Sequence, residues 1–167
     1  MSSRLFFSLV ISFLHAGISY GATSHCTSEE TVVFSCSLGN KTVSVCGSKG
    51  FTGTSGYLQY RFGKHGAPEN IYPSLGDPPT KYTERQWVPL GGGGEAYLRF
   101  KKANYAYVVY SSYSHGNEFF GVVVEKNGKV IANHKCRNNP IPVSIIDWTD
   151  FGTLGLPEGP QEFDPTP

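Results

Sequence analysis

The sequence has few charged residues, and their signs are balanced. Only 16% of the 167 residues are Asp, Glu, Lys or Arg, and the formal net charge is +1. No basic stripe and no block of like charge occurs along the chain. Dedicated binding of nucleic acids or other polyanionic surfaces depends on clustered basic charge. The composition therefore argues against both classes of partner.

The chain also lacks an apolar segment long enough to span a membrane comfortably, which takes about 20 residues. Its one marked apolar run, residues 5–14, follows Arg4 and precedes small residues such as Ala16 and Gly17. That order of charge, apolar run and small residues is typical of a secretory signal. We therefore predict a cleaved signal peptide over residues 1–21. The mature protein is expected to be periplasmic or secreted, with no membrane anchor.

Cysteine is scarce, but its four positions are informative. Cys26, Cys36, Cys46 and Cys136 all follow the predicted signal. An even number of cysteines in an exported chain predicts disulfide bonds, and four cysteines allow three pairings. No Cys-x-x-Cys pair occurs. We therefore expect structural disulfides and neither a metal site nor a cofactor.

The segment around Cys36 and Cys46 has the pattern of a hairpin. A turn at residues 39–40 would place Cys36 opposite Val43 and Cys46 opposite Val33. The period-2 alternation of strands then puts the two cysteines on opposite faces, which disfavours a bond between them. We favour Cys26–Cys46 with Cys36–Cys136, although the sequence alone does not choose among the pairings.

No window shows the sustained 3.6-residue apolar period of a helix. Short alternating segments bounded by turn residues recur instead, and Asn127-Gly128 favours a two-residue type I′ turn. Pairing of Phe100 with Tyr105 is expected in the preceding hairpin. The predicted strands are residues 31–36, 42–46, 56–62, 83–88, 95–100, 105–110, 119–125 and 129–134. We predict an all-β domain over residues 22–156, a single antiparallel meander of about eight strands forming a small, disulfide-stabilised barrel or sandwich.

Three segments fall outside that pattern. Residues 63–81 contain four prolines, so we expect a loop there and not an ordinary strand. Residues 143–148 form a further candidate strand. Residues 157–167 are a Pro/Gly-rich tail, expected to be disordered or draped over the surface.

The sequence contains no recognisable catalytic motif. Ser55 lies between glycines but lacks the Gly-x-Ser-x-Gly elbow, and the glycine run 91–94 lacks the Lys-Ser/Thr of a phosphate loop. The run is expected to bend the chain or to let a partner approach the backbone. We predict a non-enzymatic protein.

Two segments are candidates for partner binding. In the first, a Gly/Ser loop leads into a strand whose alternation puts Tyr57, Gln59 and Arg61 on one face and Leu58, Tyr60 and Phe62 on the other. Tyr and Arg are enriched at binding hot spots. The second is the Ser/Tyr-rich connection at residues 110–118. The predicted partner-binding residues are Ser55, Gly56, Tyr57, Tyr60, Arg61, Tyr113 and His115.

Two resemblances add to this interpretation. The order Val-Val-Phe-Ser-Cys36, Ser-Gly-Tyr-Leu-Gln-Tyr-Arg-Phe62, Gly-Gly-Gly-Gly94 and Cys136 resembles small exported bacterial β-proteins of unassigned function. Ser55-Gly56 followed by a tyrosine is similar to the loop of periplasmic lysozyme inhibitors, whose Ser hydroxyl binds the catalytic carboxylates of lysozyme. Position 59 is Gln where that loop has Tyr, and the inhibitors' second loop has no counterpart.

The second resemblance implies a protein partner, an exported hydrolase such as lysozyme. Three alternatives remain: an immunity protein, a cell-wall glycan-binding module in which exposed Tyr and Trp87 stack on sugars, and an uncharacterised envelope hydrolase.

Overall fold

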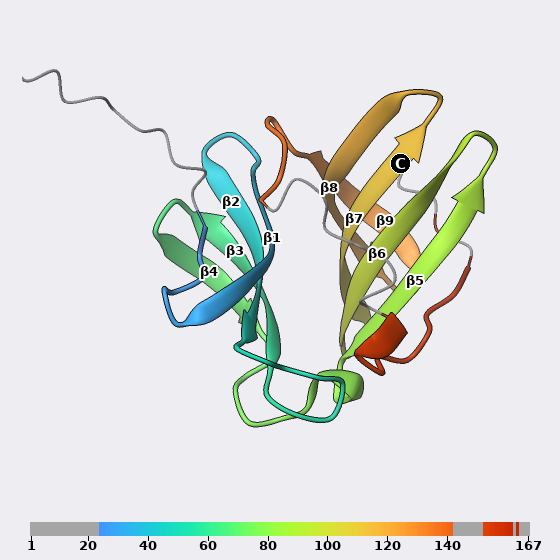
Figure 1. The fold of residues 1–167 in the computed structure, drawn as a ribbon. Helices are drawn as coiled ribbons and strands as arrows, with labels where there is room; N and C mark the ends of the chain where they lie inside the picture. Colours follow the sequence, from blue (N-terminus) through green and yellow to red (C-terminus); the bar gives the residue numbers. More distant parts are fainter. Residues whose placement is uncertain (1–23, 142–151, 162, 164–167) are drawn as a thin grey trace, which may run out of the picture.

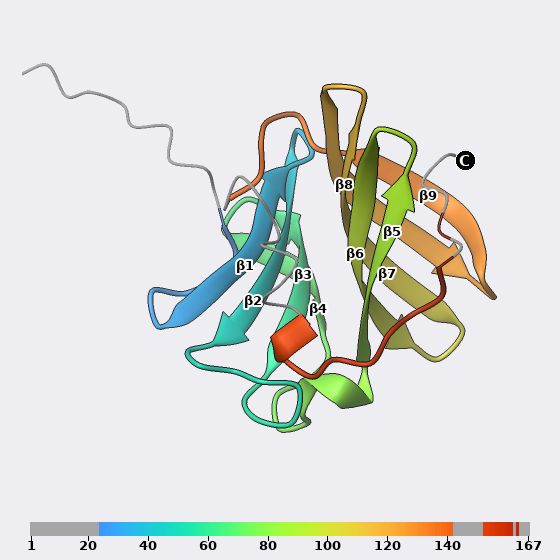
Figure 2. The same cartoon turned by 45° about the vertical axis from the view of Figure 1, so that its right-hand side comes forward.

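Two antiparallel sheets make up the structure, a computed structural model that describes residues 24–141, 152–161 and 163 (Figures 1 and 2). The first sheet has the order β1 (Glu30–Ser37), β2 (Lys41–Ser48), β3 (Leu58–Lys64), β4 (Ala67–Tyr72). The second has the order β5 (Thr83–Leu90), β6 (Gly93–Lys102), β7 (Tyr105–Ser114), β8 (Asn117–Lys126), β9 (Lys129–Lys135). A 3-10 turn, η1 (Pro79–Lys81), lies between them.

The predicted all-β antiparallel meander is confirmed, in a form that is not closed into a barrel. Each sheet follows chain order, as hairpin connections require. The candidate strand at residues 143–148 and the predicted signal peptide lie outside the described residues. No helix among the described residues is long and apolar enough to cross a membrane.

The main core lies between the two sheets. Alternate residues of each strand face it, including Phe34 and Val45 from the first sheet and Phe100 and Val109 from the second. Tyr60 contacts the second sheet directly: its ring stacks on Tyr107 with centroids 4.9 Å apart. Only 2% of Tyr60 is exposed. The predicted alternation of β3 is therefore confirmed, and the face that packs into the core holds one of the predicted partner-binding residues.

Strand β4 was not expected, because its segment contains proline. It pairs only with β3 in the described sheet, so one side of its backbone needs no ladder partner. Pro68 lies next to a register shift in that pairing, and a Cβ at Gly63 would collide with the backbone of Glu69. Proline is tolerated at edge strands and irregularities, so the predicted loop is wrong for residues 67–72.

Three details of register depend on turns and bulges. Cys36 lies opposite Val43 as predicted, but a bulge between Val32 and Phe34 places Cys46 opposite Val32. Phe100 pairs with Tyr107 and not with Tyr105, because the turn is shorter than expected. A shift of two residues keeps every side chain on its face. The turn at Asn127-Gly128 has φ angles of 50° and 71°, as a type I′ turn requires.

Both favoured disulfides are present. Cys26–Cys46 has a Cα–Cα distance of 5.3 Å and holds the N-terminal segment against the first sheet. Cys36–Cys136 has a Cα–Cα distance of 5.7 Å and joins β1 to the segment after β9. The two cysteines of the first hairpin are thus bonded to different parts of the chain: Cys46 to the N-terminal segment and Cys36 to the segment after β9.

The segments after β9 cover two strand edges. Ile141 pairs with Ser35 of β1, and Glu158 pairs in parallel with Arg85 of β5. Leu156 is 4% exposed and belongs to the main core, and the ring of Phe163 lies 5.0 Å from that of Tyr97. The described part of the predicted tail therefore lies along the second sheet.

Candidate functional site

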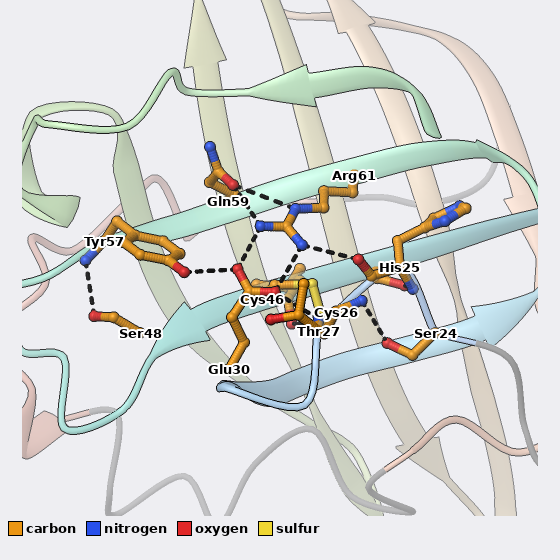
Figure 3. A network of polar contacts seen from close by, with 12 residues as sticks. Ser24, His25, Cys26, Thr27, Glu30, Cys46, Ser48, Tyr57, Gln59 and Arg61 are labelled. Atoms are coloured by element: carbon orange, nitrogen blue, oxygen red, sulfur yellow. Dashed lines mark hydrogen bonds and ion pairs between the residues drawn. A yellow bond between two sulfur atoms is a disulfide. The ribbon is translucent and has the colours of Figure 1, made fainter. Parts of the chain in front are cut away.

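The polar face of β3 forms a buried network (Figure 3). Two guanidinium nitrogens of Arg61 donate to the Glu30 carboxylate, Nη1 to Oε2 at 2.8 Å and Nη2 to Oε1 at 2.5 Å. Arg61 also donates to Gln59 Oε1 at 2.7 Å and to the His25 carbonyl at 2.8 Å. Tyr57 completes the network by donating its hydroxyl to Glu30 Oε1 at 2.7 Å.

The N-terminal segment covers this face. The side chains of Arg61 and Glu30 are only 10% and 4% exposed, and Cys26–Cys46 lies beside them (Figure 3). Tyr60 and Arg61 are therefore wrong as surface contacts: one lies in the core and the other beneath the N-terminal segment. Strand alternation groups side chains by face, but it does not tell which other segment covers each face.

The network also sets the charge state of Glu30. Burial raises its pKa, but hydrogen bonds from Arg61, the Thr27 amide and Tyr57 outweigh that effect and lower the pKa to about 2. The hydrogen bond to this carboxylate, with burial second, raises the pKa of Tyr57. Glu30 therefore stays ionised through the neutral range and anchors residues 24–30 to β3.

The Ser-Gly loop lies between β2 and β3. Its backbone is held by hydrogen bonds from Gly53 to Leu154 at 2.5 Å and from Thr80 to Gly53 at 2.9 Å. Gly56 has a φ of 72°, which favours glycine. Ser55 is exposed, and its hydroxyl forms no hydrogen bond with any residue that the structure describes. The loop thus presents an exposed serine hydroxyl from a tethered backbone.

Tyr113 and His115 lie at the opposite end of the molecule. The β5–β6 and β7–β8 turns lie together at the top of Figures 1 and 2, whereas the Ser-Gly loop lies at the bottom. The His115 amide donates to Gly92 at 3.4 Å, which joins the two upper turns. The predicted binding residues therefore do not form one site.

An aromatic platform extends the inner face of the second sheet at this end. Trp87 lies directly opposite Ala96, and Tyr113 directly opposite Gly94. Ala96 belongs to the main core, so alternation puts both rings on the core-facing side. They remain 44% and 48% exposed, beyond the part that the first sheet covers. We call Trp87, Gly94 and Tyr113 the platform.

Gly94 is the floor of the platform. A Cβ at this position would lie 2.7 Å from Nε1 and 3.1 Å from Cε2 of Trp87, so the indole rests directly on the glycine backbone. Because directly opposite residues have Cβ atoms about 5 Å apart, Tyr113 adjoins the same spot. The glycine run had been expected to bend the chain or admit a partner. Its last member instead accommodates a tryptophan of the same chain.

A notch of about 170 Å³ lies between the start of β8 and the chain that leaves β9. Glu118, which lies opposite Tyr113, forms one wall, and the chain leaving β9 forms the other. The lining residues are Glu118, Phe119, Phe120, Lys135, Cys136, Arg137, Asn138 and Asn139. Sequence reasoning missed the notch, because it forms only where β9 ends and the chain crosses to β1.

Three histidines of the described chain have their contacts away from the Ser-Gly loop. His65 bonds the Thr42 hydroxyl at 2.6 Å, His134 stacks on Phe62, and His115 bonds Ser114. Within the described part of the chain, no group of three or more His, Cys, Asp or Glu side chains could hold a metal ion.

No family model, curated protein or solved structure matches this chain.

Proposed function

We propose that this chain is an exported, non-enzymatic binding protein whose platform binds a cell-wall or cell-surface glycan. The observation that carries the proposal is the pair of neighbouring exposed rings, Trp87 and Tyr113, on a glycine floor. Sugar rings have an apolar C–H face that stacks on aromatic rings, and their hydroxyls bond the polar groups around it. Trp and Tyr suit such a surface because each combines a large apolar body with a polar end.

The position of the rings supports this function. Both lie on paired strands, so little conformational freedom remains to be lost when a ligand binds. Two disulfides are typical of an oxidising compartment, where cell-wall and surface glycans occur. The site is therefore preorganised, and the compartment expected for this protein also contains the proposed ligand.

Replacing Trp87 or Tyr113 by alanine is expected to weaken glycan binding at least roughly tenfold, which corresponds to about 1.4 kcal/mol. Gly94→Ala should weaken it as well, because its Cβ would displace the Trp87 indole. The measurement is co-sedimentation with peptidoglycan and other insoluble polysaccharides. Leu75→Ala is the matched control, since Leu75 is 64% exposed but lies in the connection between β4 and η1. Equal binding by all four variants would refute the assignment of the site.

A second candidate function rests on the Ser-Gly loop: inhibition of a lysozyme through Ser55, Gly56 and Tyr57. The exposed Ser55 hydroxyl favours it, because that group could donate to a catalytic carboxylate. Ser55→Ala is then expected to weaken inhibition about tenfold or more, since hydrogen bonds to charged groups contribute about 1.5–3 kcal/mol. Assays against c-, g- and i-type lysozymes test this. Absence of inhibition by the wild-type protein, or inhibition unchanged by Ser55→Ala, would exclude this function of the loop.

A further inference from the structure

The outer face of the second sheet holds a pocket of about 370 Å³, within the roughly 300–1,000 Å³ range of small-molecule sites. Ala106 on β7 lies directly opposite Lys101 on β6 and Glu125 on β8, and all three line it. Ala106 and Tyr113 are an odd number of residues apart on the same strand, so the platform lies on the other face. We call this space the outer pocket.

The walls of the outer pocket are held in place. The β6–β7 and β8–β9 turns bound it, and the Asn127 amide donates to the Asn104 carbonyl at 2.8 Å, which joins the two turns. Pro160 of the C-terminal segment also lines it. The Tyr97 hydroxyl donates to the Pro160 carbonyl and keeps that segment beside the sheet. The space therefore exists before a ligand enters.

Two ion pairs line the outer pocket. Arg99 Nη1 donates to Glu125 Oε2 at 2.8 Å, and these side chains are only 12% and 7% exposed. Lys101 pairs with Glu84, which lies opposite Arg99 on β5. These four are the charged residues of the lining, two cations and two carboxylates. The pocket therefore carries no net charge that would select an anion or a cation.

The Arg99–Glu125 pair has fewer hydrogen bonds than the Arg61–Glu30 pair of the first sheet. Among the described residues, Glu125 accepts one hydrogen bond, from Arg99, whose buried Nε has no partner. Glu30 accepts bonds from two nitrogens of Arg61, a backbone amide and a tyrosine hydroxyl. Burial accordingly raises the pKa of Glu125, and the Arg99 charge offsets this only in part, whereas the pKa of Glu30 is lowered. Buried polar groups normally have partners, so the Arg99–Glu125 pair retains hydrogen-bonding capacity for a ligand.

We propose that the outer pocket binds one neutral sugar unit, with neighbouring hydroxyls against the Arg99–Glu125 pair. A hydroxyl both donates and accepts, so one such group donates to the carboxylate while another accepts from the guanidinium. The small side chain of Ala106 leaves the room that the ring fills. The balanced charge of the lining favours a neutral ring over a phosphate or a uronic acid. The pocket is separate from the platform, so this inference goes beyond the proposed function and does not depend on it.

The test is an NMR titration of the ¹⁵N-labelled protein with glucose, galactose and mannose. A ligand of this size is expected to bind with a dissociation constant on the order of 1 mM. The amide signals of Ala106, Glu125 and Gly128 should shift, and they should shift equally in Trp87→Ala. Glucuronate, which adds a carboxylate to the glucose ring, should bind no more tightly than glucose. Methyl glucoside separates two sources of the ligand: binding equal to that of glucose indicates the end of a glycan, and its loss a free sugar. Both results support the site.

Matched variants assign the binding to the outer pocket. Ala106→Leu fills the space and should raise the dissociation constant at least roughly tenfold. Ala67→Leu makes the same change at an exposed position of β4 and should leave the constant unchanged. Arg99→Met/Glu125→Leu should also remove binding, because it deletes the polar groups. Apolar replacement of a whole buried ion pair commonly preserves stability, and urea unfolding verifies that each variant is folded.

The outcomes also separate this site from the platform. If none of the three sugars shifts the pocket amides at about ten times the expected dissociation constant, the inference is overturned. Tighter binding of glucuronate than of glucose overturns the neutral ligand. Binding that persists in folded Ala106→Leu and in folded Arg99→Met/Glu125→Leu overturns the assignment to the pocket. Each of these results leaves the platform standing, because its own test is co-sedimentation with polysaccharides and the effect of Trp87→Ala on it.

Discussion

Replacing Cys36 and Cys136 together by alanine should lower the free energy of unfolding by about 4–5 kcal/mol. Their disulfide closes a loop with a sequence separation of 100 residues, and in the chain-entropy model the stabilisation grows with loop length. Equilibrium unfolding in urea under non-reducing conditions measures the change. An effect of this size is comparable with the whole stability of many small domains, so the variant is expected to be partly unfolded near body temperature.

The other disulfide provides the comparison. Cys26–Cys46 has a sequence separation of 20, for which the same model gives about 3 kcal/mol. Cys26→Ala/Cys46→Ala should therefore unfold at a higher urea concentration than Cys36→Ala/Cys136→Ala. The reverse order would show that holding the N-terminal segment over the Arg61–Glu30 pair matters more than joining the two sheets.

Glu30→Gln should lower the free energy of unfolding by about 3 kcal/mol at neutral pH, because it leaves the guanidinium of Arg61 buried without its counter-charge. The cost depends on pH. The pKa of Glu30 is about 2 in the folded protein, against 4.5 for the free side chain. Stabilisation by a carboxyl whose pKa is lowered on folding is complete above the unfolded value and is lost as the pH falls through the folded value.

The difference between wild type and Glu30→Gln should therefore shrink as the pH falls from about 4.5 to about 2. Urea unfolding across this range measures it. Glu29→Gln is the matched control, because the adjacent Glu29 is exposed and pairs with Lys49 only at 3.5 Å. That variant should behave as the wild type within about 1 kcal/mol. A difference between wild type and Glu30→Gln that does not change with pH would contradict the role of the ionised pair.

Much of the fold could be predicted because its signals are local. Alternation identified eight of the described strands, and Asn127-Gly128 identified its hairpin turn. Alternation also disfavoured a bond between Cys36 and Cys46, and the one-residue bulge near Val33 left these two cysteines on opposite faces. The choice between the two remaining pairings depended on contacts between distant segments. Strand β4 was missed because proline disfavours a central strand, and nothing local marks residues 67–72 as an edge.

Less of the candidate site could be predicted from the sequence. Tyr57, Gln59 and Arg61 share a face as predicted, yet Glu30, which lies 31 residues before Arg61, turns that face into a buried network. Tyr113 and His115 were named from their loop, and Trp87 only as a ring that could stack on sugars. Their neighbourhood depends on the register of β5, β6 and β7, and on Gly94 lying beneath the indole.

The sequence by itself thus determined that the chain forms strands, which residues share a face of each strand, where the turn at Asn127-Gly128 lies, and that Cys36 and Cys46 do not pair with each other. These follow from the two-residue period of a strand and from the conformations that Gly and Asn accept. Which faces meet, which strand lies at an edge and which aromatic rings stay exposed came from the packing of distant segments. Such contacts depend on where two sheets and two terminal segments come together, and no single stretch of sequence records that arrangement.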